Sequence, residues 1–198
     1  MPITAATLPP HLALHAASLR VDPATGELAG SLVDESTRTL GELAGLFGDE
    51  AARQAMDADT LAYRVLRHHP VEDGNDGGLF FGTSFVQPGR VGDEYFMTRG
   101  HFHSRIQAGE YYWCIAGQGV LILMDEQRRC WGERLEPGTV HYIPGRIAHR
   151  LANTGATTLH VGACWPADAG HDYAAIAERG FSARLRCIDG QPRLVEAD

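Results

Sequence analysis

Short apolar or alternating runs dominate the chain from Leu61 onward, and Gly, Pro, Asn and Asp separate them. Runs of this kind predict β-strands, and many short strands joined by turns are typical of a β-sandwich or a small barrel. The predicted strands are Leu79–Val86, Glu94–His103, Tyr111–Ala116, Val120–Met124, Thr139–Ile143 and Leu159–Trp165. The pattern therefore predicts a mostly β fold.

Two glycine-containing turns predict hairpins within this β region. Gly117-Gln118-Gly119 lies between two apolar runs, and Asp189-Gly190 lies between Ala183–Ile188 and Arg193–Val195. Tight turns of this kind join neighbouring antiparallel strands. Since Pro9-Pro10 interrupts the first segment, we expect residues 1–60 to form an arm and a helix that pack on a barrel. Residues 61–198 would form the barrel with a C-terminal helix and hairpin, all within one structural domain.

The sequence predicts helices in only two segments of the chain. Thr39 and Glu42 have the spacing of a capping box, and apolar residues follow at helical intervals up to about Met56, so a helix is expected there. A short helix is expected over His171–Arg179, because Gly180 provides a glycine stop at its C-terminal end. The predicted architecture is thus a β body with a few short helices.

Composition narrows the range of functions. The 198 residues include 17 basic and 25 acidic side chains, which gives a formal net charge of −8, and every basic residue is arginine. Without lysine, Schiff-base chemistry on a lysine side chain is excluded. An acidic balance with no basic run argues against nucleic-acid binding, which needs clustered positive charge. The expected partners are small molecules or another protein chain.

The sequence predicts neither export nor membrane contact. No stretch reaches about 18 consecutive apolar residues, and no basic residue precedes Arg20, as a secretory signal would require. The four cysteines are scattered and form no Cys-x-x-Cys pair; they are Cys114, Cys130, Cys164 and Cys187. This spacing indicates reduced thiols and a cytoplasmic location.

Three histidines and one glutamate form a candidate metal site. His101 and His103 are two residues apart in a predicted strand and would leave the same face. Glu110 follows after six residues, and His149 comes after a strand that ends at Pro144. Three imidazoles and a carboxylate suit a divalent ion such as iron, manganese, nickel, cobalt or zinc, with positions left for water or substrate. Each histidine alone is better explained as an ordinary polar residue at a strand end, so the prediction depends on their joint spacing.

That joint spacing resembles the paired motifs of the cupin superfamily. It comprises Gly100-His101-Phe102-His103, six residues, Glu110, six residues and Gly117, then Gly138, five residues, Pro144, four residues, His149, three residues and Asn153. Cupins are small jelly-roll β-barrels that hold a metal ion through two histidines and a glutamate of the first motif and one histidine of the second. The gap between His103 and Glu110 is longer than in most cupins, and Arg146 stands where many have glycine.

The longer gap resembles one family, the cupin-type glucose-6-phosphate isomerases. Three stretches carry this resemblance: Glu94–His103, Pro137–Pro144 with Ala148–Arg150, and Pro166–Tyr173. The third, Pro-Ala-Asp-Ala-Gly-His-Asp-Tyr, is the most specific, because cupins in general have no such run after the barrel. The likeness covers roughly Leu79 to Phe181. It implies interconversion of glucose 6-phosphate and fructose 6-phosphate, one divalent ion per chain with Fe²⁺ as first choice, and a homodimer.

The resemblance also implies residue roles. The metal ligands would be His101, His103, Glu110 and His149. The catalytic groups would be Glu110 as proton carrier, with Tyr112 and His171 beside the sugar. The substrate would be bound by Thr83, Thr98, Gly100, Tyr112, His171 and Tyr173, of which the first three would hold the phosphate.

Two residues near these positions depart from that scheme. Trp165 stands where relatives usually show an aromatic residue with a hydroxyl group. Arg99 is a cation next to the predicted phosphate site, but its neighbour Thr98 would point inward, so we expect Arg99 to face solvent. Two other functions stay open at this point, a ferrous-iron cupin dioxygenase and a catalytically silent phosphosugar-binding cupin.

Overall fold

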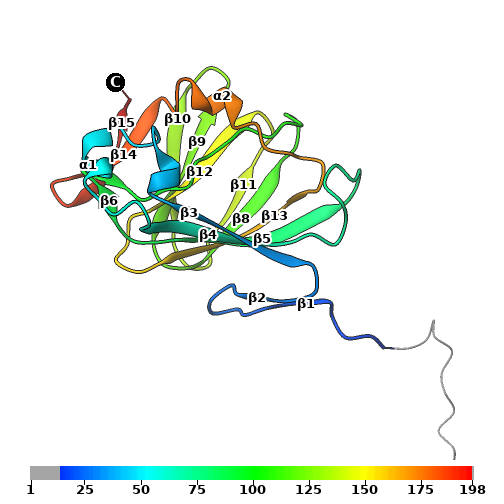
Figure 1. Cartoon of the computed structure of the whole chain (residues 1–198). Coiled ribbons are helices and arrows are strands. Elements are labelled where there is room, and N and C mark those ends of the chain that lie inside the picture. Colours follow the sequence, from blue (N-terminus) through cyan, green and yellow to red (C-terminus); the bar gives the residue numbers. More distant parts are fainter. Residues whose placement is uncertain (1–13, 198) are drawn as a thin grey trace, which may run out of the picture.

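The computed structural model describes residues 14–197, and the Pro9-Pro10 part of the predicted arm lies outside the described residues. Its largest element is a six-stranded antiparallel sheet with the strand order β11-β8-β13-β5-β4-β3 (Figure 1). The strands of this sheet are β3 (Val33–Thr39), β4 (Leu61–His68), β5 (Leu79–Val86), β8 (Glu110–Ala116), β11 (Val140–Ile143) and β13 (Leu159–Pro166).

Three smaller sheets complete the β structure. The three-stranded sheet has the order β10-β9-β12, the four-stranded sheet has the order β15-β14-β7-β6, and β1 pairs with β2. Their strands are β1 (Leu19–Val21), β2 (Leu28–Gly30), β6 (Arg90–Val91), β7 (Glu94–Tyr95), β9 (Gly119–Asp125), β10 (Cys130–Leu135), β12 (Ile147–Asn153), β14 (Ala183–Ile188) and β15 (Gln191–Glu196).

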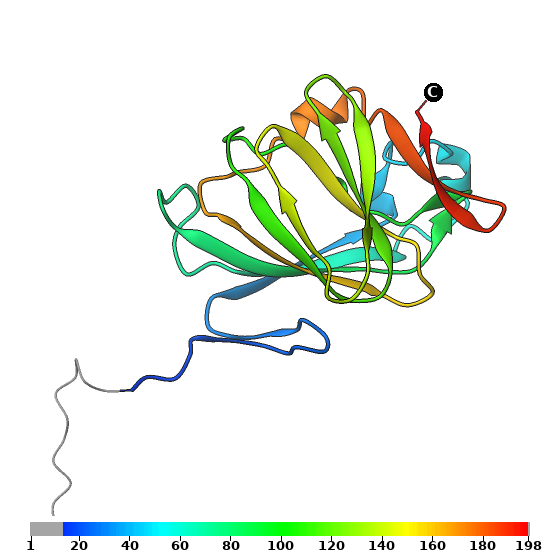
Figure 2. The same cartoon turned by 180° about the vertical axis from the view of Figure 1, so that it is seen from behind.

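The hydrophobic core lies between the six-stranded and the three-stranded sheets, which together enclose a barrel (Figure 2). Every residue of β9 is buried, and side chains from both sheets, such as Val86 and Leu121, belong to one apolar cluster. Burial of apolar side chains from two facing sheets is the main source of stability in such folds. The mostly β cupin fold predicted from the sequence is confirmed.

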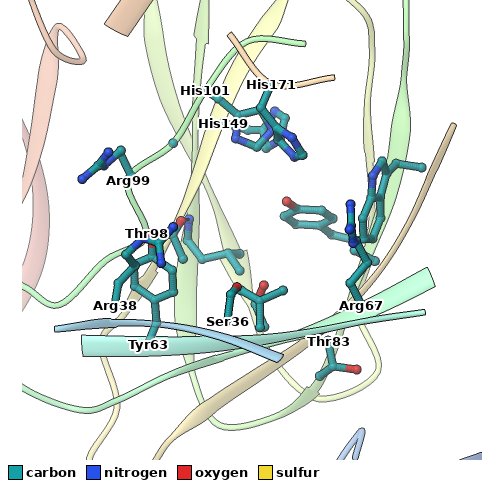
Figure 3. A pocket seen from close by; sticks show the side chains of 18 of the residues that line it. Ser36, Arg38, Tyr63, Arg67, Thr83, Thr98, Arg99, His101, His149 and His171 are labelled. Atoms are coloured by element: carbon teal, nitrogen blue, oxygen red, sulfur yellow. Dashed lines mark hydrogen bonds between the residues drawn. The ribbon is translucent and has the colours of Figure 1, made fainter. Parts of the chain in front are cut away.

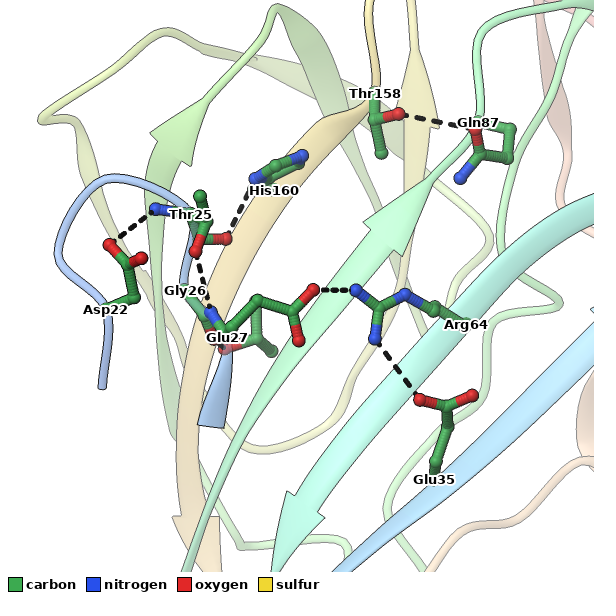
Figure 4. Close-up of polar contacts among 10 residues, drawn as sticks. Asp22, Thr25, Gly26, Glu27, Glu35, Arg64, Gln87, Thr158 and His160 are labelled. Carbon is green, nitrogen blue, oxygen red and sulfur yellow. Dashed lines mark hydrogen bonds and ion pairs between the residues drawn. The ribbon is translucent and has the colours of Figure 1, made fainter. Parts of the chain in front are cut away.

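The β1–β2 hairpin lies on the outer face of the six-stranded sheet (Figure 4). The hydroxyl of Thr83 on β5 donates a hydrogen bond to the Gly26 carbonyl at 2.8 Å. The ring of His160 on β13 contacts the Thr25 carbonyl at 2.8 Å, and Arg64 on β4 pairs with Glu27. Polar anchors from three strands therefore hold this hairpin. After it, β3 pairs with β4 along its length, so part of the first 60 residues belongs to the main sheet.

The helix expected from Thr39 to about Met56 is wrong as a continuous element. The structure has a 3₁₀ helix at Gly41–Leu43 and a separate helix α1 at Glu50–Gln54. Gly45 separates them with a φ of +77°, a left-handed conformation that ends a helix. One half of the capping box is present, because the Thr39 N–H donates to the Glu42 carboxylate at 2.9 Å.

The strand expected over Glu94–His103 is wrong beyond Tyr95. The rest of this segment runs beside β12 through isolated bridges, among them His101 with His149. Gly100 interrupts the pleat with a φ of +79°, which a regular strand does not accommodate. His149 itself lies inside β12, not in a loop after the preceding strand.

The two predicted hairpins have different outcomes. The Asp189-Gly190 hairpin is confirmed, because β14 and β15 pair on either side of it. Gly117-Gln118-Gly119 instead joins β8 and β9, which belong to different sheets, so the hairpin expected there is wrong. The C-terminal helix α2 is shorter than expected, at Ala174–Ala177. No helix among residues 14–197 is long and apolar enough to cross a membrane.

Candidate metal centre and active-site cavity

Four candidate ligands meet at one end of the barrel interior. Glu110 is the first residue of β8, His149 lies on β12, and the segment before β8 supplies His101 and His103. The backbone itself joins two of them, since the His149 N–H donates to the His101 carbonyl at 3.1 Å. A Cβ at Gly100 would come within 3.0 Å of the His149 carbonyl oxygen. Glycine at this position therefore permits the close approach that brings the two histidines together.

The donor atoms of these four residues converge. One ligand atom from each of His101, His103, Glu110 and His149 lies within 4.8 Å of all the others. The Oε1 atom of Glu110 is 2.5 Å from Nε2 of His149 and 3.4 Å from Nε2 of His103. The structure thus brings together all four residues that the sequence predicted as metal ligands.

Hydrogen bonds behind the rings orient them for coordination. The Nδ1 atom of His103 lies 2.8 Å from the Ala108 carbonyl, and that of His149 lies 3.2 Å from the Ile147 carbonyl. A ring that donates from Nδ1 presents the lone pair of Nε2, which is the usual arrangement of a metal-binding histidine. Nε2 of His101 and of His149, and Oε1 of Glu110, are buried without a hydrogen-bond partner among the described residues.

The electrostatics favour the metal-binding protonation states of His101 and Glu110. Burial, together with the neighbouring histidines, lowers the pKa of His101 well below its ordinary value. Burial would raise the pKa of Glu110, but the His149 and His103 rings outweigh that effect and lower it to about 2. A neutral imidazole and a carboxylate are the protonation states that ligands need. Three nitrogens and one oxygen suit iron, manganese, nickel, cobalt or zinc, so these residues fit a divalent ion.

A cavity of about 380 Å³ opens beside this centre (Figure 3). Glu110, His101 and His149 form part of its wall, and Tyr112, two residues after Glu110 on β8, lines it as well. Burial and the Glu110 charge raise the pKa of Tyr112 well above its ordinary value, so its hydroxyl stays a hydrogen-bond donor. This cavity is large enough for a small sugar derivative.

His171 and Tyr173 close one side of the cavity. The His171 ring lies 4.3 Å from the ring of His101, and it stacks on Tyr173 with an interplanar angle of 11°. A backbone bridge between Phe102 and Asp172 holds the His171 segment against the metal-site segment. Burial lowers the pKa of His171, which favours the neutral ring at neutral pH. Both residues, which the sequence analysis predicted as substrate contacts, line the cavity.

The three predicted phosphate residues all line the cavity, but the Thr83 side chain points away from it. Thr98 and Gly100 line the cavity, and the Thr98 hydroxyl accepts a hydrogen bond from the Leu151 N–H at 3.0 Å, which leaves its own proton for a ligand. Thr83 points to the opposite face of β5 (Figure 3), where its hydroxyl donates to the Gly26 carbonyl. Its neighbour Ser84 lies on the inner face and lines the cavity. The structure therefore offers the Ser84 hydroxyl in place of that of Thr83.

Several cavity residues were missed by the sequence analysis. They are Ser36 and Arg38 on β3, Tyr63 and Arg67 on β4, and Ser84 on β5. Ser36 and Arg38 are two positions apart, and Tyr63 and Arg67 are four apart. An even separation along a strand places the members of each pair on one face. This period was available for Leu61–His68. It was not visible for Val33–Thr39, because that segment carries no alternation of apolar and polar residues.

Trp165 and Arg99 also line the cavity. The Trp165 indole packs edge-on against Phe80 with ring centroids 5.9 Å apart. A Cβ at Gly82 would lie 2.6 Å from the Leu66 carbonyl oxygen and 3.0 Å from the indole, so the strand and the indole together favour glycine at this position. Arg99 is exposed, as expected, and donates from Nη2 to the Glu42 carbonyl at 2.7 Å. Arg99 lies at the mouth of the cavity, where a ligand can reach its side chain.

The fold and this centre define a cupin with a candidate mononuclear metal site. The model of the family described as glucose-6-phosphate isomerase (GPI) matches residues 37–196. The chain belongs to this glucose-6-phosphate isomerase family.

Individual relatives agree with the family assignment. The glucose-6-phosphate isomerase of Thermococcus litoralis is 41% identical over 75% of this chain and 78% of its own length. That of Pyrococcus furiosus is 37% identical over 90% of this chain and 93% of its own length. A putative glucose-6-phosphate isomerase 2 of Rhizobium meliloti is 40% identical over 86% of each chain. The similarity extends through β3, so it includes residues before position 60 that the sequence analysis left out of the resemblance.

Proposed function

We propose that this chain is a metal-dependent aldose–ketose isomerase that interconverts glucose 6-phosphate and fructose 6-phosphate. The family supplies the reaction, and one observation carries the residue assignment: the Glu110 carboxylate belongs both to the ligand cluster and to the wall of the cavity. Its pKa of about 2 keeps Glu110 ionised at neutral pH, and only the ionised carboxylate can accept a proton. A carboxylate at that position can take a proton from one sugar carbon and return it to the neighbouring carbon.

The metal ligands in this proposal are His101, His103, Glu110 and His149. Ferrous iron is the first candidate for the ion, and manganese, nickel, cobalt and zinc suit the same donors. When bound, a divalent ion supplies a Lewis acid that stabilises negative charge on the sugar oxygens. The fit of the residues to an ion is supported by their three buried donor atoms that lack hydrogen-bond partners.

The remaining cavity residues bind and orient the sugar. The protonated Tyr112 hydroxyl donates a hydrogen bond to a sugar oxygen beside Glu110, and His171, neutral at neutral pH, assists ring opening by moving a proton at the ring oxygen. Tyr173 stacks behind His171 and holds its ring. In this proposal Thr98 donates its hydroxyl proton to a phosphate oxygen, and the Gly100 N–H donates to the same group.

The proposal includes a homodimer of two copies of this chain. Three residues on the outer face of β8 and β11 are unusually exposed for apolar side chains: Tyr111 at 53%, Tyr142 at 56% and Val140 at 65%. The Tyr111 and Tyr142 rings pack against each other with centroids 5.2 Å apart. Contiguous exposed aromatic side chains favour association, and the homodimer that the resemblance implies would cover them. Four free cysteines support the cytoplasmic location that is part of this proposal.

The decisive experiment measures conversion of fructose 6-phosphate to glucose 6-phosphate by chelator-stripped protein, before and after addition of Fe²⁺ or Mn²⁺. We expect activity to be lost on stripping and restored by the ion. Oxygen consumption is followed in parallel as a control for dioxygenase chemistry. A folded, metal-loaded protein without isomerase activity would contradict the proposal, and sugar-phosphate binding in that protein would leave a silent binding role.

A further inference from the structure

Two arginines at one end of the cavity carry positive charge that no carboxylate balances. Of the charged residues that line the cavity, Arg67 pairs with Asp34 and Asp73, each at 3.1 Å. Arg38 and Arg99 have no ion-pair partner among the described residues. The carboxylates of Asp34 and Glu35, which also line the cavity, pair with Arg67 and Arg64, so neither balances the charge of Arg38 or Arg99.

Backbone carbonyls hold both guanidinium groups in place. Arg38 donates from Nη1 to the Thr37 carbonyl at 2.6 Å, and Arg99 donates from Nη2 to the Glu42 carbonyl at 2.7 Å. The Glu42 carboxylate does not pair with Arg99, because it accepts the hydrogen bond of the Thr39 N–H at 2.9 Å. Each guanidinium has five N–H donors, so several remain for a ligand.

The two arginines lie on the same side of the cavity as the phosphate candidates Thr98 and Gly100. Figure 3 shows Arg38, Arg99, Thr98 and Tyr63 together on one side of the cavity, away from Arg67. The charges of Arg38 and Arg99 both act to lower the pKa of Tyr173, although burial outweighs them and raises it.

We propose that Arg38 and Arg99 form a two-arginine clamp on the substrate's phosphate group and so select a dianionic sugar phosphate over the unphosphorylated sugar. Hydroxyl and amide donors alone leave two negative charges unbalanced, whereas guanidinium groups bind phosphate oxygens with charge-assisted, bidentate hydrogen bonds. The inference rests on the proposed function for the identity of the sugar. The anion clamp itself depends only on the two arginines and the cavity.

The test uses inorganic phosphate as a probe, because its binding needs no turnover. Calorimetry on the full-length, metal-loaded protein would compare the wild type with Arg38→Gln and Arg99→Gln. Each substitution is expected to raise the phosphate dissociation constant about tenfold, the usual effect of losing a hydrogen bond to a charged group. Arg99→Lys keeps the charge and should recover part of the loss, and Arg129→Gln, at an exposed ion pair with Asp125, is the matched control.

Kinetics with fructose 6-phosphate provide the second measurement. Each Gln variant should raise KM about tenfold with a smaller change in kcat, since the clamp lies away from the reacting carbons. Metal content and thermal unfolding are checked in every variant. Unchanged phosphate binding in the folded Arg38→Gln and Arg99→Gln proteins would overturn the clamp even if the wild type is an isomerase. Weakened phosphate binding without any isomerase activity would instead retain the clamp and contradict the proposed reaction.

Discussion

The Oε1 atom of Glu110 and the Nε2 atom of His149 lie 2.5 Å apart inside the barrel. When His149 carries its proton on Nδ1, directed at the Ile147 carbonyl, Nε2 has a lone pair, and so does the carboxylate oxygen. Two buried donors that face each other at this distance need a positive charge between or beside them. The pair therefore links metal binding to the protonation state of the proposed catalytic carboxylate.

The first prediction separates these two roles of the pair. Glu110→Gln retains a carbonyl oxygen as a ligand and should keep most of the metal, but it should lower kcat by about a hundredfold or more because the base is gone. His149→Ala removes a ligand and should lose metal and activity together. Metal analysis and fructose 6-phosphate turnover on the same samples test both statements. Full activity in Glu110→Gln would disprove the role of Glu110 as proton carrier. Glu136→Gln, the same substitution at an exposed residue, is the control and should leave metal content and activity unchanged.

The second prediction concerns neighbouring hydroxyl groups on β5. Thr83→Val removes the hydrogen bond to Gly26 in a buried contact and should cost about 1–3 kcal/mol of unfolding free energy with KM unchanged. Ser84→Ala should have the opposite effect, a severalfold rise in KM for fructose 6-phosphate with little change in stability. Urea unfolding and steady-state kinetics distinguish the two. A higher KM in a fully stable Thr83→Val protein would return that hydroxyl to the substrate site.

The Thr83 and Ser84 pair also shows where sequence reasoning reaches its limit. The ligands His101, His103, Glu110 and His149 were predictable because their spacing is specific and each side chain is chemically distinctive. A threonine beside a serine on a strand differs from it only in the face that it occupies, and no spacing rule decides that face when both faces are covered. Here the β1–β2 hairpin covers the outer face, and its docking could not be predicted from local pattern.

The fold was predictable to a similar degree. Strands with clear apolar runs, such as β5 and β13, were placed to within a residue, while the polar β3 was missed. The failed helix after Thr39 shows a competing effect: the apolar spacing was real, because Leu40 and Leu43 are buried, but Gly45 at positive φ divides the segment. Helical periodicity therefore identified the buried residues correctly and the secondary structure incorrectly.

The third prediction tests the unusual aromatic residue of the cavity. Trp165→Tyr should keep the edge contact with Phe80 and add a hydroxyl group toward the sugar, so KM for fructose 6-phosphate should fall severalfold. Trp165→Phe lacks the hydroxyl and is the matched control; it should not share the improvement. Equal KM values for the Tyr and Phe variants would mean that position 165 contributes only shape to the cavity.

The fourth prediction concerns the outer face of the main sheet. Tyr142→Glu places a charge among the exposed apolar side chains of β8 and β11 and should shift the protein from dimer to monomer in analytical ultracentrifugation. Ile188→Glu, at a partly exposed residue of β14, changes charge equally on another sheet and should leave the dimer intact. A wild-type protein that sediments as a monomer at every concentration would disprove the homodimer itself.

The fifth prediction concerns the buried thiol of Cys114. Burial, and to a lesser extent the Glu136 charge, raises the pKa of this thiol to about 11 from an ordinary value of 9.0. The folded state therefore holds the proton more tightly than the unfolded state. The resulting stabilisation is complete below pH 9 and is lost as the pH rises through 11, with a total of about 3 kcal/mol.

Two measurements check this dependence. Alkylation of Cys114 by iodoacetamide at pH 8.5, followed by mass spectrometry, should be slow in the native protein and fast in urea. The unfolding free energy of the wild type should fall between pH 9 and 11 more steeply than that of Cys114→Ala. Comparing the two proteins removes the contribution of other groups that titrate at alkaline pH, such as Tyr95, with a pKa of about 12. Identical pH slopes for the two proteins would mean that the Cys114 thiol has the same pKa in the folded and unfolded states.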